Sequence, residues 1–162
     1  MLHEFSVRYN YCSRTANPSE KGRAFVTDQT TRLVLPSHIE AVADAAAAVT
    51  DFIRICGVSE EAAFGVEMAV REAVTNAMVH GNHEDESKSV EVIFNCHANE
   101  LEVEVRDQGE GFDPATVPDP TNAENLLKTS GRGIFLMRTF MDQIEWVNRP
   151  EGGTMVRMTK RF

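Results

Sequence analysis

Apolar residues recur at helical spacing along the stretch Glu67–Asn82, which contains no proline and no glycine before Gly81. The apolar positions on and beside it are Val66, Val70, Ala73, Val74 and Ala77. This pattern predicts an amphipathic helix. At about 100° per residue, Glu72, Asn76 and His80 lie one turn apart on a ridge beside the apolar stripe. The ridge is either a solvated helix shoulder, where such spacing of charges is common, or one wall of a functional site.

A second helix is predicted before this one. Ser37 and Glu40 have the spacing of a capping box, with Ser37 as N-cap and Glu40 reaching back to it. The helix then continues to about Cys56, and Gly57 ends it as the first residue beyond the C-cap. Ser59 follows as the N-cap of the helix that carries the polar ridge.

Alternating apolar and polar residues predict strands at 31–35, 90–95, 101–106, 143–148 and 154–160. The two middle strands form a hairpin through the turn at 97–100, and a third helix is predicted over Ile134–Met141. These elements indicate an α+β domain. The side chains expected to fill its core include Met68, Met78, Met137, Met141, Phe135 and Phe140.

Residues 1–30 differ in composition from the rest of the chain. They carry a net charge of +1, which leaves −10 on residues 31–162. We expect a partly ordered N-terminal extension over 1–30, with a short strand at Phe5–Tyr11, and a single domain over 31–162.

The overall net charge of −9 argues against direct binding to nucleic acid or to an anionic membrane, because both reward Lys and Arg. Cys12, Cys56 and Cys96 lie far apart in the sequence, so neither a disulfide framework nor a thiolate zinc site is predicted. No stretch resembles a signal peptide or a membrane span. The expected location is the cytoplasm.

The strand ending at Arg106 runs directly into the sequence D-Q-G-E-G, which begins at Asp107. A carboxylate placed there accepts a hydrogen bond from an exocyclic amine, while Gly109 and Gly111 allow the backbone to approach a flat ring. The same sequence is also an acceptable loop exit. On this motif alone both interpretations stay open.

A second glycine cluster, Ser130-Gly131-Arg132-Gly133, precedes the third predicted helix. A helix N-terminus offers unpaired N–H groups and the positive end of a dipole to an anion, although a simple helix cap has the same sequence. The segment between Asp107 and this cluster contains prolines and suits a lid over a ligand better than a structural turn. The prolines are Pro114, Pro118 and Pro120.

The order E-x-x-x-N-x-x-x-H, then D-x-G-x-G, then lid and S-G-R-G resembles the GHKL ATPase superfamily. The resemblance implies the GHKL (Bergerat) ATP-binding fold, a two-layer α/β sandwich with a mixed, mostly antiparallel sheet and helices on one face. It implies that ATP or ADP binds with Mg²⁺ held by Asn76, that Asp107 recognises adenine with support from Thr154, and that Gly131 and Gly133 embrace the phosphates. We expect Ser130, Arg132 and His80 to lie near the phosphates.

Within that superfamily, the strings E-A-V-T-N-A-x-x-H-G and G-x-F-L-M-x-x-F-M-D resemble RsbW-type anti-sigma factor serine/threonine kinases over roughly residues 31–162. In this group the glutamate four residues before the asparagine is the proposed base for the target serine, a role that falls on Glu72. The resemblance implies an ATP-dependent protein kinase that phosphorylates a STAS-domain anti-sigma antagonist and sequesters a sigma factor or another regulator. It also implies a homodimer.

An alternative function is a nucleotide-gated protein-binding module with little or no kinase activity. Members of this kinase group often carry an arginine just before the lid Ser-Gly, whereas this chain has Thr129 there. The nearest arginine is Arg132, whose guanidinium fork is suited to compensating phosphate charge. Residues 37–53, which include the position where some members use a basic residue to grip sigma factor, contain no Lys or Arg.

Overall fold

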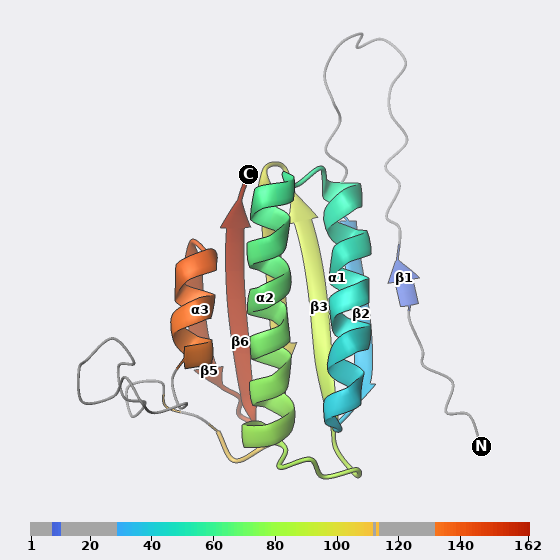
Figure 1. The fold of residues 1–162 in the computed structure, drawn as a ribbon. Helices are drawn as coiled ribbons and strands as arrows, with labels where there is room; N and C mark the ends of the chain where they lie inside the picture. Colours follow the sequence, from blue (N-terminus) through green and yellow to red (C-terminus); the bar gives the residue numbers. More distant parts are fainter. Residues whose placement is uncertain (1–7, 11–28, 112, 114–131) are drawn as a thin grey trace, which may run out of the picture.

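Helices and strands form two layers in the computed structural model, which describes residues 8–10, 29–111, 113 and 132–162 (Figure 1). The strands are β1 (Arg8–Asn10), β2 (Gln29–Pro36), β3 (Ser89–His97), β4 (Glu100–Arg106), β5 (Gln143–Asn148) and β6 (Thr154–Arg161). The helices are η1 (Ile39–Ala41), α1 (Val42–Cys56), α2 (Glu60–Asn76), the π-helical turn η2 (Ala77–Gly81) and α3 (Arg132–Phe140). The predicted α+β class is confirmed.

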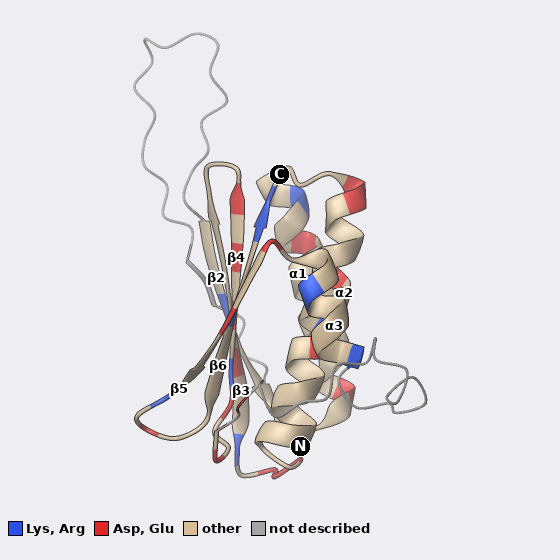
Figure 2. Ribbon diagram, turned by 90° about the vertical axis from the view of Figure 1, so that its left-hand side faces the viewer, with Lys and Arg blue, Asp and Glu red and all other residues tan. Residues whose placement is uncertain are grey.

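The strands form one sheet in the order β1-β2-β3-β4-β6-β5, and every pairing among the described residues is antiparallel. Helices α1, α2 and α3 lie on one face of this sheet (Figures 1 and 2). The described part of the strand expected at Phe5–Tyr11 is β1, which pairs with β2 at the sheet edge. No helix in the described ranges is both long and apolar enough to span a bilayer.

The core lies between the sheet and the helices. Because side chains alternate along a strand, every second residue of β3 faces the helices and is buried. The fully buried residues with the largest side chains are Phe94, Leu35, Met78, Leu101, Met137, Met158, Val49, Val66, Val70, Val74, Val90 and Val92. The predicted core positions Met78, Met137 and Met141 are therefore confirmed.

Two predicted helix ends are confirmed. Gly57 adopts φ = 71° and follows the last residue of α1, a left-handed conformation that costs glycine little. The Ser59 hydroxyl accepts a hydrogen bond from the Ala62 N–H at 3.4 Å, as an N-cap should.

The predicted capping box at Ser37 and Glu40 is wrong. The chain leaves β2 through a short 3₁₀ turn, and His38 takes the N-cap position without a side-chain cap bond. The Ser37 hydroxyl is buried and has no hydrogen-bond partner among the residues that the structure describes. The core prediction for Phe135 is also wrong, because this ring is 44% exposed on α3. In both cases the tertiary packing of neighbouring elements overrides a local pattern.

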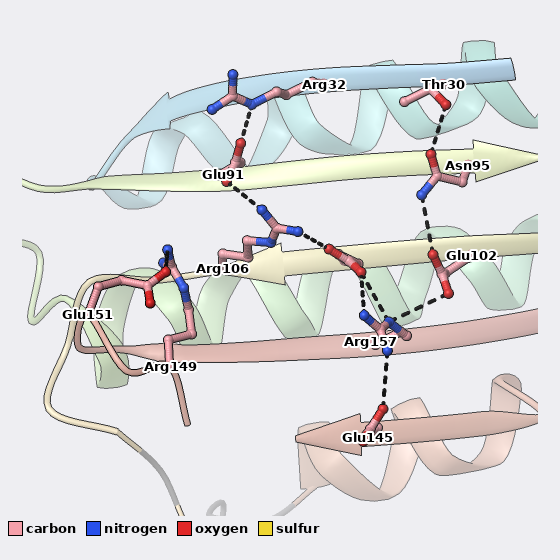
Figure 3. A network of polar contacts seen from close by, with 11 residues as sticks. Thr30, Arg32, Glu91, Asn95, Glu102, Arg106, Glu145, Arg149, Glu151 and Arg157 are labelled. Atoms are coloured by element: carbon pink, nitrogen blue, oxygen red, sulfur yellow. Dashed lines mark hydrogen bonds and ion pairs between the residues drawn. The ribbon is translucent and has the colours of Figure 1, made fainter. Parts of the chain in front are cut away.

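The face of the sheet opposite the helices carries a ladder of alternating charges (Figure 3). Glu91 pairs with both Arg32 and Arg106, and Arg106 continues the chain to Glu104. Arg157 then binds Glu104 at 2.8 Å. Burial would raise the pKa of Glu104, but the hydrogen bonds from Arg157 and Arg106 outweigh it and hold this pKa below the usual value.

This ladder predicts a pH dependence of stability. A depressed carboxyl pKa stabilises the fold above the unfolded pKa, near 4.5, and the stabilisation is lost as pH falls through the lower folded pKa. We expect Glu104→Gln to lower the free energy of unfolding at pH 7 and to flatten its decline below about pH 4.5, as measured by urea unfolding across pH. If the variant shows the wild-type slope in acid, Glu104 is not the group responsible.

Candidate functional site

The polar ridge predicted on the central helix divides into two parts in the structure. Glu72 and Asn76 are half-buried on the last turns of α2. His80 instead belongs to the π-helical turn η2, is exposed, and makes no hydrogen bond or ion pair within the described residues. Because a π turn inserts residues into the helical ladder, His80 does not continue the α-helical register of the other two.

The π turn brings Gly81 against Asp107. A Cβ placed on Gly81 would lie 2.6 Å from Cγ of Asp107, so no larger residue fits without a shift. The turn closes through the Asn82 N–H, which donates to the Ala77 carbonyl at 2.8 Å. The helix that carries Glu72 and Asn76 therefore contacts the Asp107 loop within its next turn.

Asp107 is the first residue after β4 and is 5% exposed. Its Oδ1 accepts hydrogen bonds from the N–H groups of Gly109 and Thr154, both at 2.9 Å. Its own N–H donates to the Thr154 carbonyl at 2.9 Å, and the Arg149 guanidinium donates to its carbonyl at 3.0 Å. The expected support from Thr154 thus comes from the main chain at the start of β6.

The second carboxylate oxygen, Oδ2, makes no hydrogen bond within the described residues and lies beside Gly81. Glycines surround the carboxylate: a Cβ on Gly109 would overlap the Gly81 carbonyl, and one on Gly153 would overlap the Asp107 carbonyl. A nearly buried carboxylate with one oxygen held by the backbone and the other available fits a ligand that donates one hydrogen bond, such as an exocyclic amine.

The N-terminus of α3 lies against the other half of the ridge. A Cβ on Gly133 would overlap the Glu72 carboxylate and would lie 3.7 Å from Nδ2 of Asn76. Arg132, the first residue of α3, is exposed. The start of α3 therefore lies beside a carboxylate and an amide, a set of groups suited to phosphate and a hydrated Mg²⁺.

Close packing between α2 and α3 fixes this second half of the site. A Cβ on Gly65 would lie 2.9 Å from Cδ1 of Phe140, so the two helices approach closely there. The Phe64 and Phe140 rings meet edge to face with centroids 6.0 Å apart. The position of α3 relative to Glu72 and Asn76 depends on these contacts.

The two glycines expected beside a flat ring, Gly109 and Gly111, lie close to other parts of the protein. Gly111 adopts φ = 106° and lies near the Asn148 side chain, since a Cβ placed on Gly111 would lie 3.1 Å from Oδ1 of Asn148. Gly109 does allow a close backbone approach, but to the chain itself. The positions Thr129, Ser130 and Gly131 lie outside the described residues.

Sequence patterns alone did not point to three residues of this region. Asn82 is fully buried and hydrogen bonds with the Asp107 loop, Arg149 binds the Asp107 carbonyl, and Gly153 adopts φ = 88° against Asp107. The only sequence signal was the pair of glycines before Thr154, which indicates a turn but not its contact with Asp107.

The sequence matches the family described as "Histidine kinase-like ATPase domain" over residues 35–160, which is most of the chain. The chain belongs to this histidine kinase-like ATPase family. The predicted GHKL resemblance is thereby confirmed, and an ATPase domain implies nucleotide binding.

Relatives within this ATPase family include proteins named for regulation of sigma factors. An anti-sigma F factor of Oceanobacillus iheyensis is 34% identical over 133 residues, which cover 80% of this chain and 90% of the relative. An anti-sigma F factor of Clostridium perfringens is 34% identical over 83% of this chain and 98% of its own length. The serine-protein kinase RsbW of O. iheyensis is 28% identical over 78% of this chain and 82% of its own length.

Proposed function

We propose that this protein is an ATP-dependent serine/threonine protein kinase that also acts as an anti-sigma factor, with residues 31–162 as its kinase domain and 1–30 as an extension. The proposal rests on the path of α2 and of the π turn η2 that continues it. The last turns of α2 present Glu72 and Asn76 to the N-terminus of α3, and η2 packs Gly81 against Asp107.

In this proposal the adenine ring binds at Asp107. The exocyclic amine of adenine donates to Oδ2, because Oδ1 is already occupied by two backbone N–H groups. Gly109 and Gly111 form the backbone beside the ring. The close packing of Gly81 and Gly153 around the carboxylate supports this role, since it holds the acceptor still.

The triphosphate of ATP, or the diphosphate of ADP, extends towards α3. Asn76 would hold Mg²⁺ there, as one of the few ligands that Mg²⁺ usually takes from a protein, and the ion would neutralise phosphate charge. Gly133 and Arg132 meet the phosphates at the helix start, joined by Ser130 and Gly131. His80 lies close to the phosphates on η2.

Glu72 acts as the base. The serine hydroxyl oxygen of the target attacks the γ-phosphorus, the bond to the ADP oxygen breaks, and the hydroxyl proton passes to the Glu72 carboxylate. The position of this carboxylate supports the role, since it lies one helical turn before Asn76 and against the N-terminus of α3.

The relatives named anti-sigma F factor and serine-protein kinase support the partners that we propose. We infer that the phosphate acceptor is a STAS-domain anti-sigma antagonist. The chain binds either this antagonist or a sigma factor, and the nucleotide state decides between them. It acts as a homodimer.

A second candidate function is nucleotide-gated binding without useful catalysis. Relatives named anti-sigma F factor favour it, since that name specifies binding and no transfer. Thr129 also favours this function, because it stands where members of the kinase group often carry a lid arginine. Phosphoryl transfer to a partner separates the two functions.

The test is a binding and phosphorylation assay on the wild type and Asn76→Ala. Calorimetry should show Mg²⁺-dependent ATP binding by the wild type and loss of the Mg²⁺ dependence in the variant. Co-purified proteins, incubated with ATP, should gain a phosphoserine or phosphothreonine detected by mass spectrometry. Asn95→Ala, on the far face of the sheet, is the control. Wild type that does not bind ATP contradicts the whole proposal, and binding without phosphorylation leaves the second function.

A further inference from the structure

Asn82 is a fully buried polar residue that immediately follows the π turn η2. Its side-chain oxygen accepts a hydrogen bond from the Gln108 N–H at 2.7 Å, and its Nδ2 donates to the Ser89 carbonyl at 3.0 Å. The Gln108 side chain closes the ring, since its Oε1 accepts from the Ser89 N–H at 2.7 Å. Three segments are thus tied together: the end of η2, the start of β3 and the residue after Asp107.

The Asp107 carboxylate does not need this ring for its own position. Asp107 is tied to Thr154 at the start of β6 by two hydrogen bonds and to Arg149 by a third. Glu72 and Asn76 are held separately, on α2 against α3. Within the described residues, the hydrogen bond that joins the end of η2 to the Asp107 loop is the one made by the Asn82 side chain.

The loop that Asn82 begins is also held in an uncommon conformation. His83 and Glu84 adopt φ values of 56° and 53°, a region that residues other than glycine seldom occupy. Asn82 binds both ends of this loop, through its carbonyl to the Asp85 N–H and through Nδ2 to Ser89. An amide is suited to the position because it offers one donor and one acceptor from a single planar group.

We propose that Asn82 is a positioning residue that sets the distance between the adenine half and the phosphate half of the site, without touching the nucleotide. This inference rests on the proposed nucleotide site. A ligand that spans two subsites gains about 10²- to 10⁴-fold in affinity over either part only when the geometry allows both subsites to be engaged at once. Adenosine and inorganic tripolyphosphate each occupy one half, so their binding does not depend on the spacing.

The experiment compares three probes, each with Mg²⁺, on the wild type and Asn82→Leu. Leu has the same number and branching of side-chain heavy atoms and removes both side-chain hydrogen bonds. We expect ATP affinity to fall by about 10- to 100-fold, part of the gain from engaging both subsites, while the affinities for adenosine and tripolyphosphate, measured by NMR titration, change less than about threefold. Asn95→Leu is the matched control, because Asn95 also makes two side-chain hydrogen bonds, on the sheet face away from the site. It should leave all three affinities unchanged.

An equal loss of adenosine and ATP affinity would overturn the inference, because Asn82 would then only hold the Asp107 loop. Unchanged ATP affinity in Asn82→Leu would overturn it as well. If Asn82→Leu does not fold, Gln108→Met tests the inference instead. The Gln108 side chain is exposed, and replacing it removes the hydrogen bond from the Ser89 N–H. ATP affinity should then fall about 2- to 10-fold, without a matching loss for adenosine or tripolyphosphate. A wild type that binds no ATP is a different result, which contradicts the proposed function itself.

Discussion

Asp107→Asn is expected to lower ATP affinity by roughly 10²- to 10⁴-fold. The amide keeps an oxygen for the N–H groups of Gly109 and Thr154, so the loop retains its hydrogen bonds. At the Oδ2 position, however, an NH₂ group replaces the acceptor and faces the adenine amine. A lost hydrogen bond to a charged group is worth about 1.5–3 kcal/mol, and an unsatisfied donor costs about 1–3 kcal/mol more.

The same variant should change base selectivity. Guanine presents a carbonyl oxygen where adenine has its amine, so the new NH₂ group has an acceptor only in GTP, and the ratio of ATP to GTP affinity should fall. Calorimetry with both nucleotides measures it. Asp51→Asn is the control, since it removes the same charge from an exposed site on α1. If Asp107→Asn binds ATP like the wild type, Asp107 does not recognise adenine.

Glu72→Gln is expected to retain ATP binding within a few-fold and to phosphorylate the protein target about 10²- to 10⁴-fold more slowly. Gln keeps the shape of the side chain but cannot take the hydroxyl proton, and a positioned base typically contributes that factor. Single-turnover phosphorylation of the partner at saturating ATP measures the chemical step alone.

Glu67→Gln serves as the control for this variant. Glu67 lies on the same helix and pairs with Arg71 at 3.0 Å, away from the N-terminus of α3. It should phosphorylate the partner at the wild-type rate. Phosphorylation by Glu72→Gln at the wild-type rate would show that Glu72 is not the base. Glu72 would then only contact the N-terminus of α3.

Most helices and strands could be predicted from the sequence, because each has its own pattern of apolar and polar residues or its own end signals. β5 was predicted at its observed bounds, and β2, β3, β4, β6 and α3 within a few residues. Gly57 and Ser59 mark helix ends through their own backbone and side-chain chemistry. The capping box failed because Ser37 and Glu40 fit a pattern that the exit from β2 does not allow.

Only part of the candidate site could be predicted from the sequence. The spacing of Glu72 and Asn76 follows from helical geometry, and Asp107 follows from its place at a strand end. The departure of His80 from the ridge could not be predicted, since no residue type specifies a π turn. At the end of that turn Gly81 packs against Asp107, 26 residues away in the sequence.

The sequence by itself determined the order of helices and strands, most of their buried positions and the residue types available to the site, because these depend largely on neighbours within a few positions. Only the tertiary structure decided that Gly133 meets Glu72, that Gly153 lies against Asp107 and that Asn82 binds Gln108. These contacts join segments distant in the chain. Their partners are selected by sheet register and helix packing, which no local pattern encodes.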